Sequence, residues 1–298
     1  MPSTLSSTVS ILSILLCLLA PLAAAQDRSF DSAGARIRYV DHGSGAAVLL
    51  VHGFTADLDR SWVETGILPD LARDHRVIAF DLRGHGGSDK PHEPRAYDEI
   101  ALDAIRLMDH LGVDKAHLVG YSLGGIIAAK LLTTHPQRFA SALLGGAAYR
   151  RSRSERADRA ADAAAREIEA GLYRALLVST APTDEAALTE DAIVLRSKDI
   201  AARNDQRALA ALMRARRALI VTDAEIAAVR LPALAVVGSA DPALPRVKAM
   251  QAAWPGLAVQ VVQGATHPTV HARGLPRHAA FREAIRAHIA RAKHRPHI

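Results

Sequence analysis

The stretch His117–Gly125 has the sequence HLVGYSLGG, and it decides the fold of this chain. An apolar run ends there in the pattern Gly-x-Ser-x-Gly, formed by Gly120, Ser122 and Gly124. A serine in a sharp turn between a strand and a helix is strained and points outward. A Cβ in place of either glycine would collide across such a turn. The pattern therefore predicts that Ser122 is a nucleophile, with a plain tight turn as the alternative.

The residues after the serine favour the same interpretation. Ile126–Leu132 is a helix-forming run that begins directly after the turn. The backbone N–H of Leu123, at the start of this helix, then faces whatever Ser122 attacks. Such an N–H can stabilise the negative oxygen that develops on a substrate. We expect Leu123 to supply one amide of an oxyanion hole.

A serine nucleophile needs a base, and the base needs an acid that orients it. The candidate acid is Asp241, which follows the apolar run Ala233–Val237. The candidate base is His267, which follows the next apolar run, Leu257–Val262. The order serine, aspartate, histidine along the chain is the one associated with a nucleophile elbow, and we predict this triad.

Both partners of the serine also have plainer interpretations. Asp241 precedes Pro242, so it could simply begin a turn. The chain has 14 histidines, most of which should be surface residues, and His271 is the second candidate for the base. His267 and His271 have the spacing of a metal site, but no Glu stands between them and Pro268 follows the first. We therefore predict no metal site.

The loop after the apolar run Ala46–Val51 is the expected source of a second oxyanion donor. Gly53 in this loop allows the backbone to approach a substrate closely. We predict that the Phe54 N–H acts together with the Leu123 N–H. The chain contains no glycine spacing of the dinucleotide-binding or P-loop type, so we expect no cofactor.

Apolar runs and helical stretches alternate along most of the chain. This alternation predicts a mainly parallel sheet with helices on both faces, and an active site at the carboxyl ends of the strands, where Ser122 falls. The first two strands are expected to form an edge hairpin. Strands are predicted at 36–40, 46–51, 77–80, 116–120, 139–144, 233–237 and 257–262, and helices at 67–73, 97–111 and 276–293.

Residues 149–230 break this alternation. They are rich in Ala, Arg, Asp and Glu and predict several helices. We interpret them as a helical lid inserted into one α/β domain formed by 26–148 and 231–298, with an independently folding second domain as the alternative. Its aliphatic, alanine-rich helices predict a modest apolar pocket for short to medium acyl chains. Arg214, Arg216 and Arg217 either form a solvated helix face, which we favour, or contact an anionic substrate.

The N-terminus predicts a secretory signal, residues 1–25, cleaved after Ala25. Val9–Ala25 is a short apolar run that ends in three alanines, although no Lys or Arg precedes it. The protein is then secreted or periplasmic, and an uncleaved membrane anchor is the alternative. Cys17, the only cysteine, lies in this segment, so the mature protein would have no disulfide.

The net charge of +6 does not by itself indicate a nucleic-acid partner. The 37 Lys and Arg residues are interspersed with 31 Asp and Glu residues, mostly on helical stretches. This pattern is typical of a solvated surface. We expect a small-molecule substrate, no nucleic acid, and a membrane partner only if the N-terminal segment is retained.

Several motifs together resemble the α/β-hydrolase fold family, in its serine-hydrolase, esterase-like branch. The resemblance implies a sheet of about eight strands, a helical cap after the sixth strand, and the triad above. Members with Asp at the elbow are dehalogenases and epoxide hydrolases, and Ser122 argues against both. Thr266 departs mildly from the family, which more often has Gly before the histidine. The matching segments span residues 30 to 295: His52–Phe54, Asp81–Ser88, Gly120–Gly125, Gly238–Asp241 and Gly264–His267.

These observations predict an enzyme that hydrolyses carboxylic esters through an acyl-enzyme on Ser122. The same triad would also suit a lactone, an amide, or a carbon–carbon bond next to a ketone. From a different functional class, the chain could be a ligand-binding receptor on a hydrolase scaffold. The segment Asp81–Asp89 has a plainer interpretation as a turn network of Asp81, Arg83 and Ser88.

Overall fold

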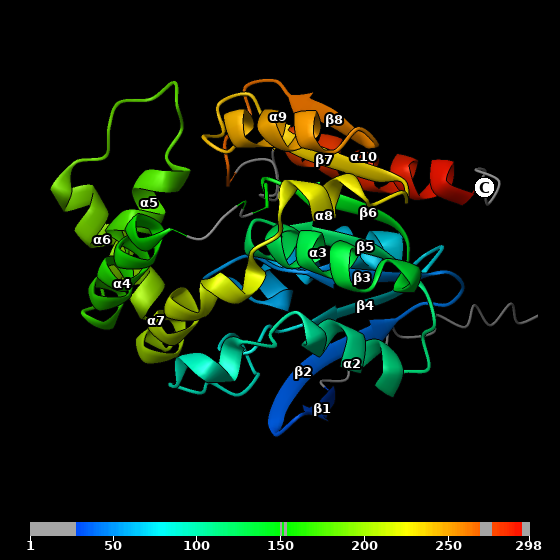
Figure 1. Ribbon diagram of the computed structural model, residues 1–298, viewed down its shortest axis with the longest axis horizontal. Helices are drawn as coiled ribbons and strands as arrows, with labels where there is room; N and C mark the ends of the chain where they lie inside the picture. Colours follow the sequence, from blue (N-terminus) through cyan, green and yellow to red (C-terminus); the bar gives the residue numbers. More distant parts are fainter. Residues whose placement is uncertain (1–27, 150, 152–153, 269–275, 294–298) are drawn as a thin grey trace, which may run out of the picture.

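The computed structural model describes residues 28–149, 151, 154–268 and 276–293. The predicted signal segment 1–25, with Cys17, and the second candidate base His271 lie outside the described residues. The elements fall into a central sheet, helices on both of its faces, and a separate group of helices at one side (Figure 1).

Within the described residues, eight strands form one sheet in the order β1-β2-β4-β3-β5-β6-β7-β8. All neighbouring pairs from β4 to β8 are parallel, whereas β1–β2 and β2–β4 are antiparallel. This is the mostly parallel, eight-stranded α/β sheet that the sequence predicts. The strands are β1 Arg28–Ser32, β2 Ala35–His42, β3 Ala47–Val51, β4 Arg76–Phe80, β5 Ala116–Tyr121, β6 Phe139–Gly145, β7 Ala233–Gly238 and β8 Leu257–Val262.

The predicted edge hairpin between residues 36–40 and 46–51 is wrong. β2 pairs with β1 and β4, whereas β3 lies between β4 and β5. Every residue of β3 is buried, and a strand that is apolar on both faces belongs in the middle of a parallel sheet. The edge hairpin is instead β1–β2, and the sequence analysis missed β1 because only Phe30 and Ser32 of its five residues are buried.

The two faces of the sheet are covered by different helices. In β5, Leu118 packs on one face and Val119 on the other, as alternation along a strand requires. The first face is covered by α2 Leu102–His110, α3 Leu123–Thr134, α8 Asp223–Ala227 and α9 Leu244–Ala253. The second is covered by η1 Asp59–Val63, α1 Ile67–Leu71 and α10 Pro276–Lys293. Two short 3-10 helices, η2 Pro94–Tyr97 and η3 Pro136–Arg138, lie in connections.

The helices between β6 and β7 form a cap beside the carboxyl ends of the strands (Figure 1). These helices are α4 Glu155–Glu169, α5 Arg174–Thr180, α6 Glu190–Ala201 and α7 Gln206–Ala215, followed by η4 Arg216–Leu219. Side chains of Ser154, Thr189 and Asp205 cap α4, α6 and α7. Such caps hold each helix start by accepting from an N–H that has no partner within the helix.

Helix α7 joins the cap to the sheet domain. Its Leu209 and Met213 pack with α4 in a small core of the cap, whereas its Leu212 packs in the main core. Ile226 of α8 also packs in the main core, so the end of the predicted lid segment 149–230 lies against the sheet domain. The cap and the sheet domain therefore share hydrophobic packing through α7.

Candidate active site

Ser122 lies at the junction of β5 and α3 in a strained backbone conformation. Its φ is 52° and its ψ is −114°. Among the non-glycine residues that the structure describes, only Ala33, Thr55 and Ser122 have positive φ. Such a conformation costs on the order of 1–3 kcal/mol and persists only where the surroundings enforce it. Here the Ser122 N–H donates to the Gly145 carbonyl at 2.8 Å, and Ile126 N–H donates to the Ser122 carbonyl at 3.1 Å.

The two flanking glycines allow this turn to close. A Cβ on Gly120 would lie 2.2 Å from the carbonyl oxygen of Gly124, and one on Gly124 would lie 2.0 Å from that of Val51. The obstructing atoms are backbone atoms, which cannot rotate away. Glycine is therefore required where β5, α3 and β3 meet.

The structure brings Ser122, His267 and Asp241 together from the ends of β5, β8 and β7. Ser122 Oγ lies 3.1 Å from His267 Nε2, and His267 Nδ1 lies 2.9 Å from Asp241 Oδ2. A carboxylate only accepts, so Nδ1–H donates to Asp241, and in the neutral imidazole Nε2 accepts from the serine hydroxyl. This is the protonation pattern of a serine activated by a histidine base.

Asp241 is held in a single orientation. Its carboxylate is fully buried, and its second oxygen, Oδ1, accepts from the Ala243 N–H at 2.8 Å. The His267 side chain is 14% exposed, and one edge of the ring lines the cavities beside Ser122. Asp241 can therefore fix the orientation of the His267 ring through Nδ1, while Nε2 on the opposite edge of the ring contacts Ser122.

Two further residues position His267, and the sequence analysis did not identify either of them. The Tyr121 hydroxyl donates to the backbone carbonyl of His267. Gly146, with φ of 56°, lies under the ring: a Cβ there would be 3.1 Å from His267 Cε1. The available signals were the Gly145-Gly146 pair after an apolar run and the aromatic residue inside the elbow.

The two predicted oxyanion donors lie at the same site. Leu123 is the first residue of α3, so its N–H has no acceptor within the helix. The loop after β3 passes close to the serine, since a Cβ on Gly53 would lie 3.3 Å from Ser122 Cβ. Phe54, Ser122 and Leu123 line one cavity. The roles of the Phe54 and Leu123 amides in stabilising an oxyanion remain a prediction.

A buried histidine supports the Phe54 loop. His52 Nδ1–H donates to the Gly53 carbonyl at 2.8 Å, and Nε2 accepts from the Leu82 N–H at 2.9 Å. Burial lowers the pKa of His52 to about 4, so the ring is neutral at pH 7 and can fill both roles at once. His52 thus ties the loop after β3 to the loop after β4.

The segment Asp81–Asp89 forms a turn network. Asp81 accepts from the N–H groups of Leu58 and Gly87 at 2.8 and 2.7 Å, and the Ser88 hydroxyl donates to the Asp81 carbonyl at 2.7 Å. Arg83 does not join this network: its side chain donates to the buried Asp103 carboxylate at 2.7 and 3.1 Å.

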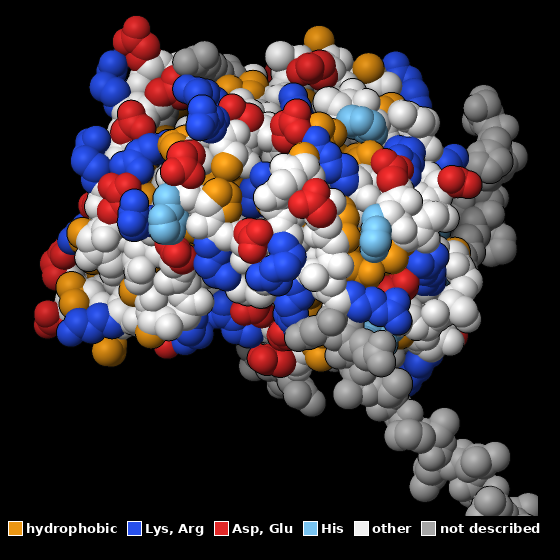
Figure 2. Space-filling view, turned by 90° about the horizontal axis from the view of Figure 1, so that it is seen from below, with side chains coloured by type: hydrophobic (Ala, Val, Ile, Leu, Met, Phe, Trp, Pro, Cys, Tyr) orange, Lys and Arg blue, Asp and Glu red, His pale blue; other side chains and the backbone are white. Residues whose placement is uncertain are grey.

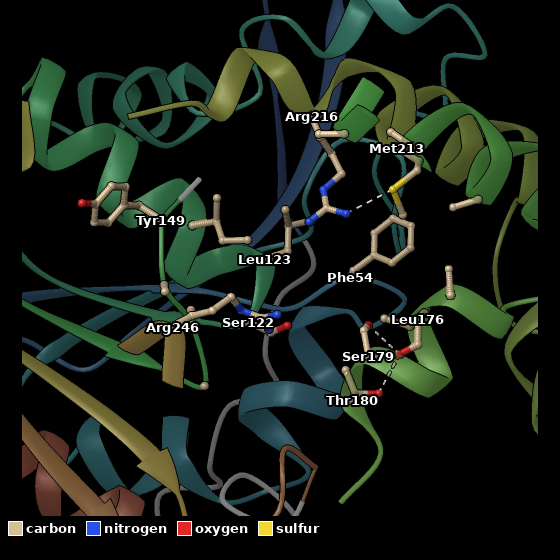
Figure 3. A pocket seen from close by; sticks show the side chains of 18 of the residues that line it. Phe54, Ser122, Leu123, Tyr149, Leu176, Ser179, Thr180, Met213, Arg216 and Arg246 are labelled. Carbon is tan, nitrogen blue, oxygen red and sulfur yellow. Dashed lines mark hydrogen bonds between the residues drawn. The ribbon is translucent and has the colours of Figure 1, made fainter. Parts of the chain in front are cut away.

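Two cavities meet at Ser122. The first, of about 700 Å³, lies under the cap between α3, α4, α7 and α9, and several of its lining residues are drawn in Figure 3. The second, of about 980 Å³, lies between the loop after β3 and helices α5 and α6. Both are lined by Phe54, Ser122, Leu176, Thr180 and His267. A substrate attacked by Ser122 therefore has space on two sides of the reacting carbon.

Two kinds of feature are absent from the residues that the structure describes. Those residues contain no group of three or more His, Cys, Asp or Glu side chains that could hold a metal ion. None of their helices is both long and apolar enough to cross a membrane. His271, which has the spacing of a metal ligand relative to His267 in the sequence, lies outside the described residues.

One curated relative matches part of the chain. The dihydrolipoyllysine-residue acetyltransferase component of an acetoin cleaving system from Cupriavidus necator is 42% identical over 123 residues, which is 41% of this chain and 32% of that protein. The chain thus spans about a third of the length of this relative.

Similarity to solved structures extends over most of the chain. A thermophilic esterase from Thermogutta terrifontis, solved with bound malate, has a TM-score of 0.72 at 23% identity, covering 90% of this chain and 99% of that one. The enol-lactonase from Burkholderia xenovorans LB400 has a TM-score of 0.71 at 22% identity, covering 88% of this chain and 100% of that one. At this identity the likeness shows the fold.

The model of the alpha/beta hydrolase fold family matches residues 46–271, which is well over half of the chain. This range contains the loop after β3, the elbow at Ser122, the cap, and both partners of the serine. The sheet order and the strained turn agree with that match. The chain belongs to the α/β-hydrolase fold family.

Proposed function

We propose that this protein is a hydrolase that cleaves carboxylic esters, with Ser122 as nucleophile, His267 as base and Asp241 as the orienting acid. The observation that carries the proposal is the continuous chain of contacts: 3.1 Å from Ser122 Oγ to His267 Nε2, and 2.9 Å from His267 Nδ1 to Asp241 Oδ2. Family membership and the intact elbow support hydrolysis as the reaction class.

In the first half of the reaction, Ser122 Oγ attacks the carbonyl carbon of the ester while its proton moves to His267 Nε2. The N–H groups of Phe54 and Leu123 stabilise the resulting oxyanion. Asp241 stabilises the imidazolium. The bond to the alcohol oxygen then breaks, and Nε2 gives its proton to the leaving alcohol, which leaves the acyl group on Ser122.

In the second half, water attacks the acyl carbon and gives a proton to His267 Nε2. The bond to Ser122 Oγ breaks, and that proton returns to the serine. The sum is ester plus water to acid plus alcohol, so the cycle needs no cofactor. The two cavities that meet at Ser122 give space for the acyl part and the alcohol part.

We favour an ester over the other bonds that the triad could cleave. A lactone presents the same carbonyl and differs only in being cyclic. An amide requires protonation of nitrogen as it leaves, and a carbon–carbon bond requires protonation of carbon. His267 Nε2 can give its proton to an alcohol oxygen or to an amine nitrogen, but the alcohol oxygen is the better leaving group and depends less on that proton, so an ester makes the least demand on these three residues.

Replacing the nucleophile tests the proposal. Ser122→Ala should lower kcat on short aryl esters by about 10⁴-fold or more, because the attacking oxygen is gone. The melting temperature and the affinity for the product should stay close to those of the native protein. The measurement is release of 4-nitrophenol from acyl esters of increasing chain length. Full turnover by the variant would refute the role of Ser122.

Labelling separates an active enzyme from a ligand-binding receptor. An organophosphonate should add to the native protein once, seen as a mass increase on the intact chain, and should not add to Ser122→Ala. A native protein that neither turns over esters nor becomes labelled would contradict the proposed function.

A further inference from the structure

The turn between α6 and α7 in the cap (Figure 1) contacts the loop after β3, which contains Phe54. Asn204 lies in this turn, and its Nδ2 donates to the Thr55 carbonyl at 3.3 Å. The same Nδ2 donates to the Ile200 carbonyl in the last turn of α6 at 2.9 Å. Both acceptors are backbone oxygens, so the nitrogen of the amide must face them. The cap thus holds a carbonyl group of the loop after β3.

Thr55 needs this support because its backbone is strained. Its φ is 62°, a region that a β-branched residue rarely adopts. The Ala56 N–H donates to the Gly53 carbonyl at 3.3 Å, so residues 53–56 form a turn with Thr55 at its third position. Glycine or asparagine usually supplies a positive φ at that position. Such a conformation persists only where its surroundings enforce it.

Two donors hold the Thr55 carbonyl, and they come from different parts of the fold. Arg60 in η1 belongs to the sheet domain, and its Nη2 donates to this carbonyl at 3.0 Å. Arg60 is itself oriented by Asp57, whose Oδ2 accepts from Arg60 Nε at 2.7 Å. Asn204 supplies the second donor from the cap. The carbonyl is therefore fixed by the sheet domain and the cap together.

The direction of the Phe54 N–H depends on this turn. A peptide unit is planar, so the Phe54 N–H points opposite to the Gly53 carbonyl. That carbonyl accepts from His52 Nδ1 at 2.8 Å and from the Ala56 N–H at 3.3 Å. Because the Thr55 carbonyl and the Ala56 N–H belong to one peptide unit, a rotation at Thr55 would remove one of these two donors. A contact with the Thr55 carbonyl therefore acts on the Phe54 N–H.

We propose that Asn204 is a positioning residue for ester hydrolysis, because it holds the Thr55–Ala56 peptide unit and thereby keeps the Phe54 N–H directed at the oxyanion. Asn204 lines neither of the two cavities, so it acts through the loop and not on the substrate. The cap then completes the oxyanion hole in addition to enclosing the substrate. This inference rests on the proposed ester hydrolysis and on the oxyanion role of the Phe54 N–H.

The first test separates substrate binding from the chemical step. Asn204→Ala should lower kcat for 4-nitrophenyl acetate about 3- to 10-fold, the effect of losing one uncharged hydrogen bond. KM should stay close to the native value, because the oxyanion exists only after Ser122 has attacked. The loss should stay below the 10²-fold or so that follows removal of an oxyanion donor, since Arg60 still holds the carbonyl. A raised KM with an unchanged kcat would contradict the proposal.

A ketone inhibitor reports on the oxyanion hole directly. With hexyl trifluoromethyl ketone, Ser122 Oγ adds to the carbonyl carbon, the serine proton moves to His267 Nε2, and the ketone oxygen becomes an oxyanion. In Asn204→Ala the inhibition constant of this ketone should rise by about the factor by which kcat falls. An unchanged inhibition constant would show that the oxyanion hole is intact without Asn204, and would overturn the proposal.

His92→Ala is the matched control for the loss of a contact between the cap and the sheet domain. His92 Nε2 lies 3.1 Å from Oδ2 of Asp205, the residue next to Asn204. This contact joins the same turn to the connection between β4 and η2, away from the loop after β3. His92→Ala should therefore leave kcat and the inhibition constant close to the native values. Equal losses in both variants would assign the effect to docking of the cap and overturn the proposal.

Asn204→Asp retains the size of the side chain and removes the donor. A carboxylate only accepts hydrogen bonds, so it would face the carbonyls of Thr55 and Ile200 without a hydrogen to share. This variant should lower kcat at least as much as Asn204→Ala, and it serves where Asn204→Ala folds poorly. A native kcat in Asn204→Asp would show that the amide donor is not needed.

Failure of this inference and failure of the proposed function have different signatures. If the native protein hydrolyses esters and Asn204→Ala retains the native kcat and inhibition constant, only the role of Asn204 is refuted. Absence of ester hydrolysis by the native protein, together with absence of organophosphonate labelling, defeats the proposed function instead.

Discussion

Two buried histidines lie side by side behind the Phe54 loop. The rings of His52 and His85 pack edge to face with their centroids 5.2 Å apart. The ring of His85 packs in the same way against that of Phe54, with a centroid distance of 5.8 Å. Burial, together with the neighbouring His52, lowers the pKa of His85 to about 3. His85 Nε2 has no hydrogen-bond partner among the described residues. Protonation of either ring in the folded state is therefore strongly disfavoured.

Acid should destabilise the fold through these two residues. The unfolded chain binds protons at histidine as pH falls through about 6.5, whereas the folded chain does so only near pH 4 and 3. Stability is therefore lost as pH falls through that window. Each ring should contribute roughly 2 kcal/mol of loss between pH 7 and pH 5. Urea unfolding of the native protein and of His85→Phe at both pH values measures this.

The informative quantity is the difference between the two pH values within each protein, because the substitution can also change packing. His85→Phe should lose less stability on acidification than the native protein. Equal losses would show that His85 does not account for the acid sensitivity.

At the residue scale, the local sequence was sufficient to predict the functional residues that directly follow a strand. Ser122, Asp241 and His267 each follow an apolar run, and the structure places them within hydrogen-bonding distance. Tyr121 and Gly146 could not be inferred in the same way. Their contacts with His267 depend on the pairing of Tyr121 with Gly145 between two parallel strands. The register of that pairing cannot be predicted from the residues of either strand alone.

At the scale of elements, helix α4 forms an alanine wall of the first cavity. Ala157, Ala160, Ala161 and Ala164 recur at helical spacing and line the cavity together. Because each side chain is a single methyl group, the space beside Ser122 remains open. The length of acyl group that fits should therefore depend on this face of α4.

Enlarging one of these alanines should shorten the acyl preference. Ala161→Leu places an isobutyl group in the cavity, so kcat/KM should fall about 10-fold or more for octanoyl esters while acetyl esters change little, in line with the 1–3 kcal/mol typical of overpacking. The control is Ala163→Leu, on the exposed face of the same helix. A 4-nitrophenyl ester series gives the measurement, and an unchanged chain-length profile in Ala161→Leu would contradict the prediction.

Strand order was the part of the element scale that the sequence did not reveal. The apolar runs located seven strands, but the chain places β3 between β4 and β5 instead of beside β2. A continuous apolar run indicates that a strand is buried in the middle of the sheet, but it does not indicate which strands pair with it. β1 was missed because three of its residues, beginning with Arg28 and Ser29, are exposed.

At the scale of the whole molecule, the surface mixes charges of both signs. Figure 2 shows one face on which Lys and Arg side chains alternate with Asp and Glu. Many charged side chains of the described residues form ion pairs, among them Arg76 with Asp41 at 2.8 Å and Arg286 with Asp74 at 2.6 Å. This face offers no extended area of one sign for a polyanion, in keeping with the small-molecule partner that we propose.

The N-terminal segment leads to a prediction about location. We propose that residues 1–25 direct export and are removed, because the apolar run ends in small residues before Gln26. Expressed in full length in a Gram-negative host, the protein should be recovered from the periplasm with an intact mass that begins at Gln26. Recovery of the full-length chain in the membrane fraction would instead support a retained anchor.

The positive φ of Ser122 means that the residue required for activity also lowers the stability of the fold. The turn stores conformational energy in the native state, and glycine is the residue that would release it. Selection for heat resistance alone would therefore favour the loss of the nucleophile. A laboratory evolution scheme that screens only for survival of heating should be expected to enrich inactive proteins altered at this residue, so a catalytic screen must accompany it.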